Sequence, residues 1–115
     1  MEPENWRPWG YYEILTDAEN HKVKRITVLP EKRLSLQFHY KRSEHWVIVS
    51  GWGRVTRGEE VITAMPGNHI YIPVMMRHRI ENTHWEDPLV FIETQLGEYF
   101  GEDDIVRIED DFDRT

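Results

Sequence analysis

The sequence predicts an all-β domain of the jelly-roll type, on the strength of three observations. Its apolar residues come in runs that are short for helices and suited to strands. Glycine, proline and asparagine separate these runs at the spacing typical of sandwiches and barrels. The chain has 115 residues without an internal repeat or a low-complexity linker. Because this length supports one hydrophobic core, we expect a single domain over residues 1–115.

The expected strands follow from these apolar runs and from the turn residues between them. Nine strands are expected, in the order Tyr11–Leu15, Val23–Leu29, Leu34–Tyr40, His45–Ser50, Gly53–Arg57, Glu60–Ala64, His69–Ile72, His78–Asn82 and Leu89–Gln95. Turn chemistry separates them at residues 29–32, 50–53, 57–59, 65–68 and 82–88. About nine short strands fit two sheets packed face to face.

The C-terminal segment departs from the strand pattern. Three acidic residues follow Gly101, where negative charge stabilises the first turn of a helix. We therefore expect a short helical turn within Gly101–Arg107. The acidic stretch Glu109–Asp113 is interpreted as a solvated chain end.

Composition and charge narrow the function classes. The 21 acidic and 14 basic residues give a formal charge of -7, which repels nucleic acids and anionic lipids, so we expect neither as a partner. The absence of cysteine excludes disulfides, thiolate ligands and a cysteine nucleophile. No basic stretch precedes an apolar run at the N-terminus, and no apolar run reaches the length of a membrane span. We expect a cytoplasmic protein.

Two predicted strands carry polar residues that alternate with apolar ones. In residues 34–41, Gln37 and His39 share a face with Lys41, opposite an apolar face. In the next strand, Glu44 shares a face with apolar residues and the other face is also apolar, so we expect both faces to be covered. A carboxylate in such a place is costly unless a cation or a donor meets it, which favours a metal ion.

A later strand offers a matching ligand, His78, on the same face as Ile80 and Asn82. Gln37, His39, Glu44 and His78 together supply two imidazoles, a carboxylate and an amide oxygen. This set suits one divalent ion (Zn, Mn, Fe, Co or Ni), with positions left for water or substrate. Taken singly, each of these residues has a structural alternative.

The spacing of these residues resembles the cupin family. Gln37-x-His39, four residues, Glu44, six residues and Gly51 resemble its first motif, with Gln37 where many cupins have histidine. Gly67, five residues, Pro73 and then His78, three residues and Asn82 resemble the second, with Met75 where the family usually has glycine. The resemblance implies a double-stranded β-helix and a metal ion.

A narrower resemblance covers almost the whole chain. The strings Arg7–Gly10, Leu34–His39, Arg42–Gly51 and Gly97–Arg107, with Ile72-Pro73 and His78-Arg79, resemble the type II mannose-6-phosphate isomerase domain. This implies a metal-dependent aldose–ketose isomerase acting on mannose 6-phosphate and fructose 6-phosphate, on the route to GDP-mannose and polysaccharide. In that family the domain usually follows a mannose-1-phosphate guanylyltransferase. The glycine-rich nucleotide-binding segment is absent from this sequence, so we expect a stand-alone isomerase domain.

Isomerisation requires a base beside the reacting carbon and cations for the phosphate. Candidate bases are Glu93, His45 and Lys41, and Glu93 is favoured because it lies in an apolar strand, where burial raises its proton affinity. Its alternative is a buried carboxylate paired with arginine. Candidate phosphate ligands are Lys41, Arg42, Arg79 and Arg107. Arg79 alternates away from His78, so an outer ion pair is its alternative, and that of Arg107 is capping of residues 102–104.

Two other functions stay open at this point. One is a non-catalytic or regulatory module that binds a metal or a sugar. The other is an iron-dependent dioxygenase, because His39, Glu44 and His78 also form the two-histidine, one-carboxylate set. Whatever the function, we expect a homodimer, since the apolar strand faces and the N-terminal tryptophans exceed what a small barrel covers.

Overall fold

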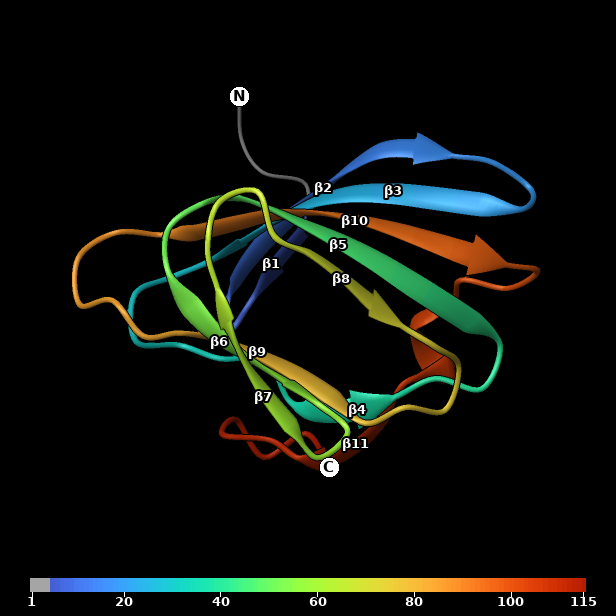
Figure 1. Ribbon diagram of the computed structural model, residues 1–115. Coiled ribbons are helices and arrows are strands. Elements are labelled where there is room, and N and C mark those ends of the chain that lie inside the picture. The colour runs from blue at the N-terminus through green and yellow to red at the C-terminus, as the bar shows by residue number, and fades with distance from the viewer. Residues whose placement is uncertain (1–4) are drawn as a thin grey trace.

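The computed structural model describes residues 5–115, which form two antiparallel sheets stacked face to face (Figure 1). The first sheet has the strand order β1-β2-β3-β10-β5-β8 and the second β11-β4-β9-β6-β7. The elements are β1 (Asn5–Arg7), β2 (Gly10–Asp17), β3 (His21–Val28), β4 (Leu36–Phe38), β5 (Arg42–Ser50), β6 (Gly53–Arg57), β7 (Glu60–Ala64), β8 (His69–Ile72), β9 (His78–Asn82), β10 (Leu89–Gly97), the 3-10 turn η1 (Glu102–Asp104) and β11 (Val106–Glu109). The jelly-roll prediction is confirmed.

The core lies between the sheets and follows the alternation of the strands. From the first sheet, Ile48 and Phe91 point inward with at most 1% of their surface exposed. Val55 and Ile80 meet them from the second sheet and are fully buried. Each such side chain leaves water on folding, which is the main source of stability.

Strand register sets the positions of the polar residues that share this interior. In the first sheet, Glu93 on β10 lies directly opposite Lys24 on β3 and Trp46 on β5. In the second sheet, Gln37 on β4 lies directly opposite His78 on β9 and Arg107 on β11. Directly opposed residues point to the same face of a sheet, so each row projects together into the interior.

The C-terminal segment differs from its expectation. The helical turn is present but covers only Glu102–Asp104, and Val106–Glu109 continues as a strand paired with β4. The following residues are not a free solvated end, because Asp111 pairs with Arg33 at 2.8 Å and Phe112 packs against the core. A local acidic pattern favoured the turn, but pairing with a strand far away in sequence decides the rest.

Further differences concern the bounds of three strands and the outer face of β5. The expected strand Leu34–Tyr40 is reduced to β4, and β5 begins earlier than expected, at Arg42. The short edge strand β1 was not expected. The outer face of β5 is not covered within this chain, since Val47 and Val49 are 44% and 50% exposed. No helix in the described residues has the length and hydropathy to cross a membrane.

Candidate active site

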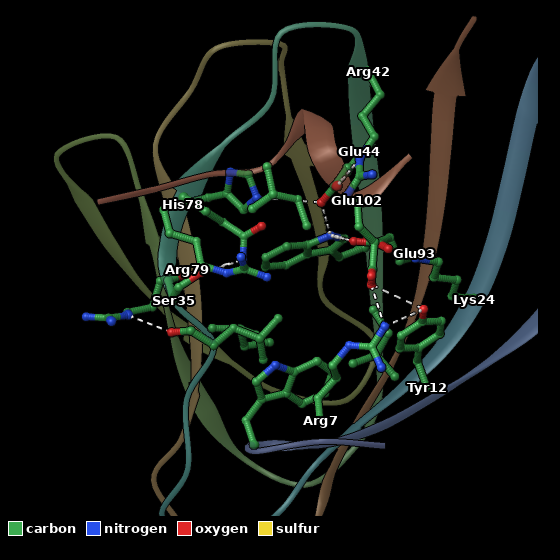
Figure 2. A pocket seen from close by; sticks show the side chains of 18 of the residues that line it. Arg7, Tyr12, Lys24, Ser35, Arg42, Glu44, His78, Arg79, Glu93 and Glu102 are labelled. Atoms are coloured by element: carbon green, nitrogen blue, oxygen red, sulfur yellow. Dashed lines mark hydrogen bonds and ion pairs between the residues drawn. The ribbon is translucent and has the colours of Figure 1, made fainter. Parts of the chain in front are cut away.

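A polar cavity of about 60 Å³ opens between the two sheets (Figure 2). Among the described residues, six basic side chains and three carboxylates line it: Arg7, Lys24, Arg42, Arg79, Arg107 and Arg114 with Glu44, Glu93 and Glu102. If all are ionised, the lining carries three excess positive charges in a chain whose formal charge is -7. The cavity therefore favours an anion, contrary to the net charge of the chain.

Three buried residues converge at one wall of this interior. His39 comes from the chain just after β4, Glu44 from β5 and His78 from β9, and one ligand atom of each lies within 4.8 Å of the others. The Nε2 atom of His39 is 3.2 Å from Glu44 Oε2, and that of His78 is 3.7 Å from Glu44 Oε1. Three of the four predicted metal ligands are thus brought together.

The hydrogen bonds of the two histidines fit a metal centre. His39 Nδ1 lies 3.2 Å from the carbonyl oxygen of Asp104, and His78 Nδ1 lies 2.8 Å from that of Met76. A carbonyl oxygen only accepts, so Nδ1 carries the proton in both rings and a neutral ring directs its Nε2 lone pair inward. Metal-bound histidines are oriented by this kind of outer hydrogen bond. Two lone pairs and a carboxylate that face one another favour a positive charge between them.

Arg42 supplies part of that positive charge. Its Nε donates to Glu44 Oε2 at 2.9 Å and its Nη2 to His39 Nε2 at 3.4 Å. Its Nη1 is buried without a hydrogen-bond partner among the described residues. The sequence argument required a cation or a donor beside Glu44 and favoured a metal ion; Arg42 and the Trp46 indole, 3.1 Å from Glu44 Oε1, already supply both kinds of partner.

The pKa values of the cluster reflect both burial and charge. Burial alone would raise the pKa of Glu44, but its contact with His39 and the charge of Arg42 outweigh it and hold that pKa well below its usual range. Burial lowers the pKa of His78, against the opposing charge of Glu44. A carboxylate that stays charged and a histidine that stays neutral are the states that bind a divalent ion.

Gln37 lies beside the cluster, but its amide nitrogen is engaged elsewhere. It donates to Ser35 Oγ at 3.0 Å and, at 3.4 Å, to the Ser35 carbonyl. Neither bond uses its amide oxygen, which is the atom that a metal ion would take. Its role as a fourth ligand stays a prediction.

Glu93 lies on the adjacent wall and is also fully enclosed. Its Oε1 accepts from Trp46 Nε1 at 3.1 Å and its Oε2 from Gln95 Nε2 at 2.8 Å. Burial, reinforced by the nearby charge of Glu44, raises the pKa of Glu93 to about 8. Among residues 5–115, Glu93 makes no ion pair with an arginine. The alternative prediction, a buried carboxylate paired with arginine, is therefore not supported.

The comparisons with known proteins identify the family of this chain. The chain matches the family described as mannose-6-phosphate isomerase C-terminal over residues 1–110. It belongs to that family. The xanthan biosynthesis protein XanB of Xanthomonas campestris is 50% identical over 110 residues, which cover 96% of this chain and 23% of XanB. The mannose-1-phosphate guanylyltransferase ManC of Salmonella typhimurium is 46% identical over 115 residues, 100% of this chain and 24% of ManC.

A third relative is the alginate biosynthesis protein AlgA of Pseudomonas aeruginosa, 45% identical over 112 residues, 97% of this chain and 23% of AlgA. The chain thus spans about a quarter of the length of these relatives. Their names place two of them in polysaccharide biosynthesis and describe the third as a mannose-1-phosphate guanylyltransferase.

Solved structures show the same fold at low sequence identity. Oxalate decarboxylase from Bacillus subtilis superimposes with a TM-score of 0.78 at 21% identity, covering 90% of this chain and 29% of that one. A double-stranded β-helix protein from Klebsiella pneumoniae gives 0.77 at 15% identity, covering 93% and 90%. The cupin resemblance read from the two motifs is confirmed for the fold.

Within this mannose-6-phosphate isomerase C-terminal domain, two predicted site residues lie away from the cavity. Lys41 is exposed, with its Nζ 4.9 Å from the centre of the Tyr99 ring. His45 lies on the outer face of β5, stacked on His69 with ring centroids 5.3 Å apart. Because β4 ends at Phe38, the alternation that predicted an inward Lys41 does not extend to that residue. Along β5, neighbouring residues point to opposite faces, so His45 points outward while Glu44 points inward.

The other predicted cations do reach the cavity, and three more join them. Arg42, Arg79 and Arg107 line it as expected. Arg79 is committed to the structure, because its Nε donates to the Leu34 carbonyl at 2.9 Å and its Nη1 lies 3.3 Å from Glu109. The residues that sequence reasoning missed are Arg7, Lys24 and Arg114.

Lys24 carried a readable signal, since it alternates with Ile26 and Val28 on the inward face of its strand. It is 6% exposed, and its Nζ lies 4.3 Å from the centre of the Tyr12 ring. Burial lowers its pKa, although Glu93 opposes this. Arg7 lies on the three-residue strand β1 and Arg114 lies outside every described strand, so neither belonged to an alternating pattern long enough to indicate its direction.

Proposed function

We propose that this chain is a metal-dependent sugar-phosphate isomerase that interconverts mannose 6-phosphate and fructose 6-phosphate in the cytoplasm. The observation that carries the proposal is a His–Glu–His cluster that reaches the cavity through Glu44 and His78, beside a protonatable carboxylate and an excess of positive charge. Aldose–ketose exchange needs a group that stabilises charge on oxygen, a base and an anion-binding site. Membership of the mannose-6-phosphate isomerase C-terminal family supports the same substrate.

The residues around the cluster fit a divalent ion. His39, Glu44 and His78 would hold it, and Gln37 on β4 is the candidate for a fourth position. Such an ion, when bound, stabilises the negative charge that develops on a sugar oxygen when a proton leaves the adjacent carbon. The unpaired Nη1 of Arg42 is a further donor for a sugar oxygen in the same region.

Glu93 is the proposed base. Trp46 and Gln95 fix its two oxygens, so its position does not depend on solvent. A pKa of about 8 lies close to neutral pH, where a general base combines availability with proton affinity. Glu93 would take a proton from one carbon of the substrate and return it to the neighbouring carbon, while the hydroxyl proton of one sugar oxygen passes to the other.

A coupled assay for fructose 6-phosphate tests the proposal. The chain is first treated with chelator, and Mn²⁺, Zn²⁺ or Co²⁺ is then added with mannose 6-phosphate. We expect turnover that depends on metal and falls about 100-fold or more in Glu93→Gln. The matched control is Glu81→Gln, because Glu81 lies on the outer face of β9, paired with Arg54. A folded, metal-loaded protein without turnover would contradict the proposal.

A second function is favoured by one observation, the contacts of Arg42 with two of the candidate ligands. A guanidinium in that place compensates Glu44 without an ion and would suit a non-catalytic module that only binds a sugar phosphate. Binding of mannose 6-phosphate with no conversion under any metal would identify this function. Isothermal titration of mannose 6-phosphate into the protein used in the assay measures this binding and so separates the binding module from the isomerase.

A further inference from the structure

The six cations that line the cavity are not equivalent. Arg42 is held by Glu44 and His39, and Arg79 by Glu109 and the Leu34 carbonyl. Arg107 makes no ion pair within the described part of the chain, and its Nε is buried without a hydrogen-bond partner. A buried donor without a partner costs free energy, so its retention points to a ligand that accepts from it.

Arg107 belongs to a cluster of arginines at one end of the cavity. The charges that act on it come from Arg114 and Asp110 in the C-terminal segment, Glu102 in η1 and Arg7 in β1. Those that act on Glu44 come from Arg42, His78 and His39, and the two sets share no residue. We call Arg7, Arg107 and Arg114 the arginine pole, which is separate from the metal-ligand cluster.

The acidic neighbours do not neutralise this pole. Arg7 pairs with Glu102 at 2.7 Å, and Arg114 pairs with Asp110 at 2.7 Å. Three guanidiniums therefore face two carboxylates, and the unmatched charge is that of Arg107. An anion placed there would bind next to a buried N–H and a planar fork, which is the geometry that suits phosphate oxygens.

The register of the second sheet sets the distance between the arginine pole and the metal-ligand cluster. Arg107 on β11, Gln37 on β4 and His78 on β9 form one row across three neighbouring strands. Strands lie about 4.8 Å apart, so the backbones of Arg107 and His78 are about 10 Å apart. A six-carbon sugar phosphate spans such a distance with its carbonyl end at one side and its phosphate at the other.

We propose that the arginine pole binds the phosphate of a sugar phosphate whose reacting carbons lie at the His39, Glu44 and His78 cluster. The proposal rests on the proposed function and adds the direction of the substrate in the cavity. It assigns phosphate recognition to Arg107 with Arg7 and Arg114 beside it, and it removes Arg79 and Lys41 from that role. It also makes the C-terminal strand β11 a part of the site.

Inorganic phosphate is the probe that tests this assignment apart from catalysis. Isothermal titration of the chelated full chain measures its affinity for phosphate in the parent, Arg107→Ala and Arg54→Ala. Arg54 is the matched control, because it is an arginine 53% exposed on β6, paired with Glu81. We expect Arg107→Ala to weaken phosphate binding about 10-fold or more and Arg54→Ala to leave it unchanged.

Two more variants make the outcome decisive. Arg107→Lys keeps the charge without the planar fork and should lie between parent and alanine, which covers the case in which Arg107→Ala does not fold. His39→Ala should retain phosphate affinity, since it alters only the metal-ligand cluster. If the folded Arg107→Ala variant binds phosphate as tightly as the parent, the assignment of phosphate binding to the arginine pole is overturned. If Arg107→Ala does not fold, the same result in Arg107→Lys overturns it. Absent turnover with Arg107-dependent phosphate binding would instead count against the isomerase alone.

Discussion

Trp46 joins the two carboxylates of the site. Its single indole N–H lies 3.1 Å from Glu44 Oε1 and 3.1 Å from Glu93 Oε1. The same carboxylates have pKa values moved in opposite directions, well below the usual range for Glu44 and up to about 8 for Glu93. Paired acids with separated pKa values are a recurrent arrangement in acid–base catalysis, because one stays charged while the other exchanges a proton.

The raised pKa of Glu93 predicts a pH dependence of stability. The unfolded chain releases this proton near pH 4.5 and the folded chain near pH 8, so the free energy of unfolding falls as pH rises between those values. Glu93→Gln removes this contribution. Its stability relative to the parent should therefore increase from pH 5 to pH 8, by about 1.4 kcal/mol for each pH unit at most. Chemical denaturation of chelated protein at both pH values measures the difference, and a pH-independent difference would contradict the assignment.

Strand alternation predicted the inward placement of most site residues. Gln37 and Glu44 lie on the expected inward faces of β4 and β5, His39 is buried one residue past the end of β4, and Glu93 is buried as expected on β10. Alternation fails for Lys41, where the strand has already ended, and it cannot reveal Asp104. The buried carboxylate of Asp104 accepts from the backbone N–H groups of Tyr40 and Lys41, and its carbonyl orients His39 from 65 residues away.

At the scale of elements, the turn between β8 and β9 holds an unusual residue. Met75 has a φ of 67°, in the left-handed region that glycine favours, and its backbone N–H donates to the His39 carbonyl at 2.7 Å. The position where the sequence departs from the second cupin motif is therefore the position where the backbone needs that glycine conformation. The turn geometry is kept despite the methionine.

Met75→Gly should relieve this conformation. A non-glycine residue in the left-handed region costs about 1–2 kcal/mol, and the greater freedom of glycine in the unfolded chain offsets about 0.5–1 kcal/mol of that. We expect a net gain of about 0.5–1 kcal/mol in the free energy of unfolding, measured by urea denaturation. Met75→Ala keeps the strained φ and is the control. Equal stability of the glycine and alanine variants would contradict the explanation.

The elements predicted from sequence are those whose signals are local. Gly53–Arg57, Glu60–Ala64, His69–Ile72 and His78–Asn82 have the predicted bounds, and each is flanked by glycine, proline or asparagine within a few residues. The edge strands β1 and β11 were missed because each has only three or four residues and takes its stability from its partner strand.

At the scale of the whole molecule, the outer face of the first sheet remains apolar. Val47, Val49, Tyr71 and Leu96 come from its adjacent strands β5, β8 and β10, and each is 42% to 50% exposed. We expect a second copy of this chain to cover this face, in a homodimer. Light scattering after size exclusion measures the mass, and a monomer at all concentrations would contradict the expectation. Val47→Lys should weaken the dimer, whereas Val61→Lys, at a 66% exposed position on β7, should not.

The cation-binding capacity of the His39, Glu44 and His78 cluster is the claim on which the isomerase depends. Elemental analysis of the purified chain after loading with Mn²⁺, Zn²⁺ or Co²⁺ and removal of free ion tests it most directly. We predict one equivalent of metal in the parent and little in His39→Ala or His78→Ala, with strand content by circular dichroism unchanged. Full metal content in both variants would contradict the account.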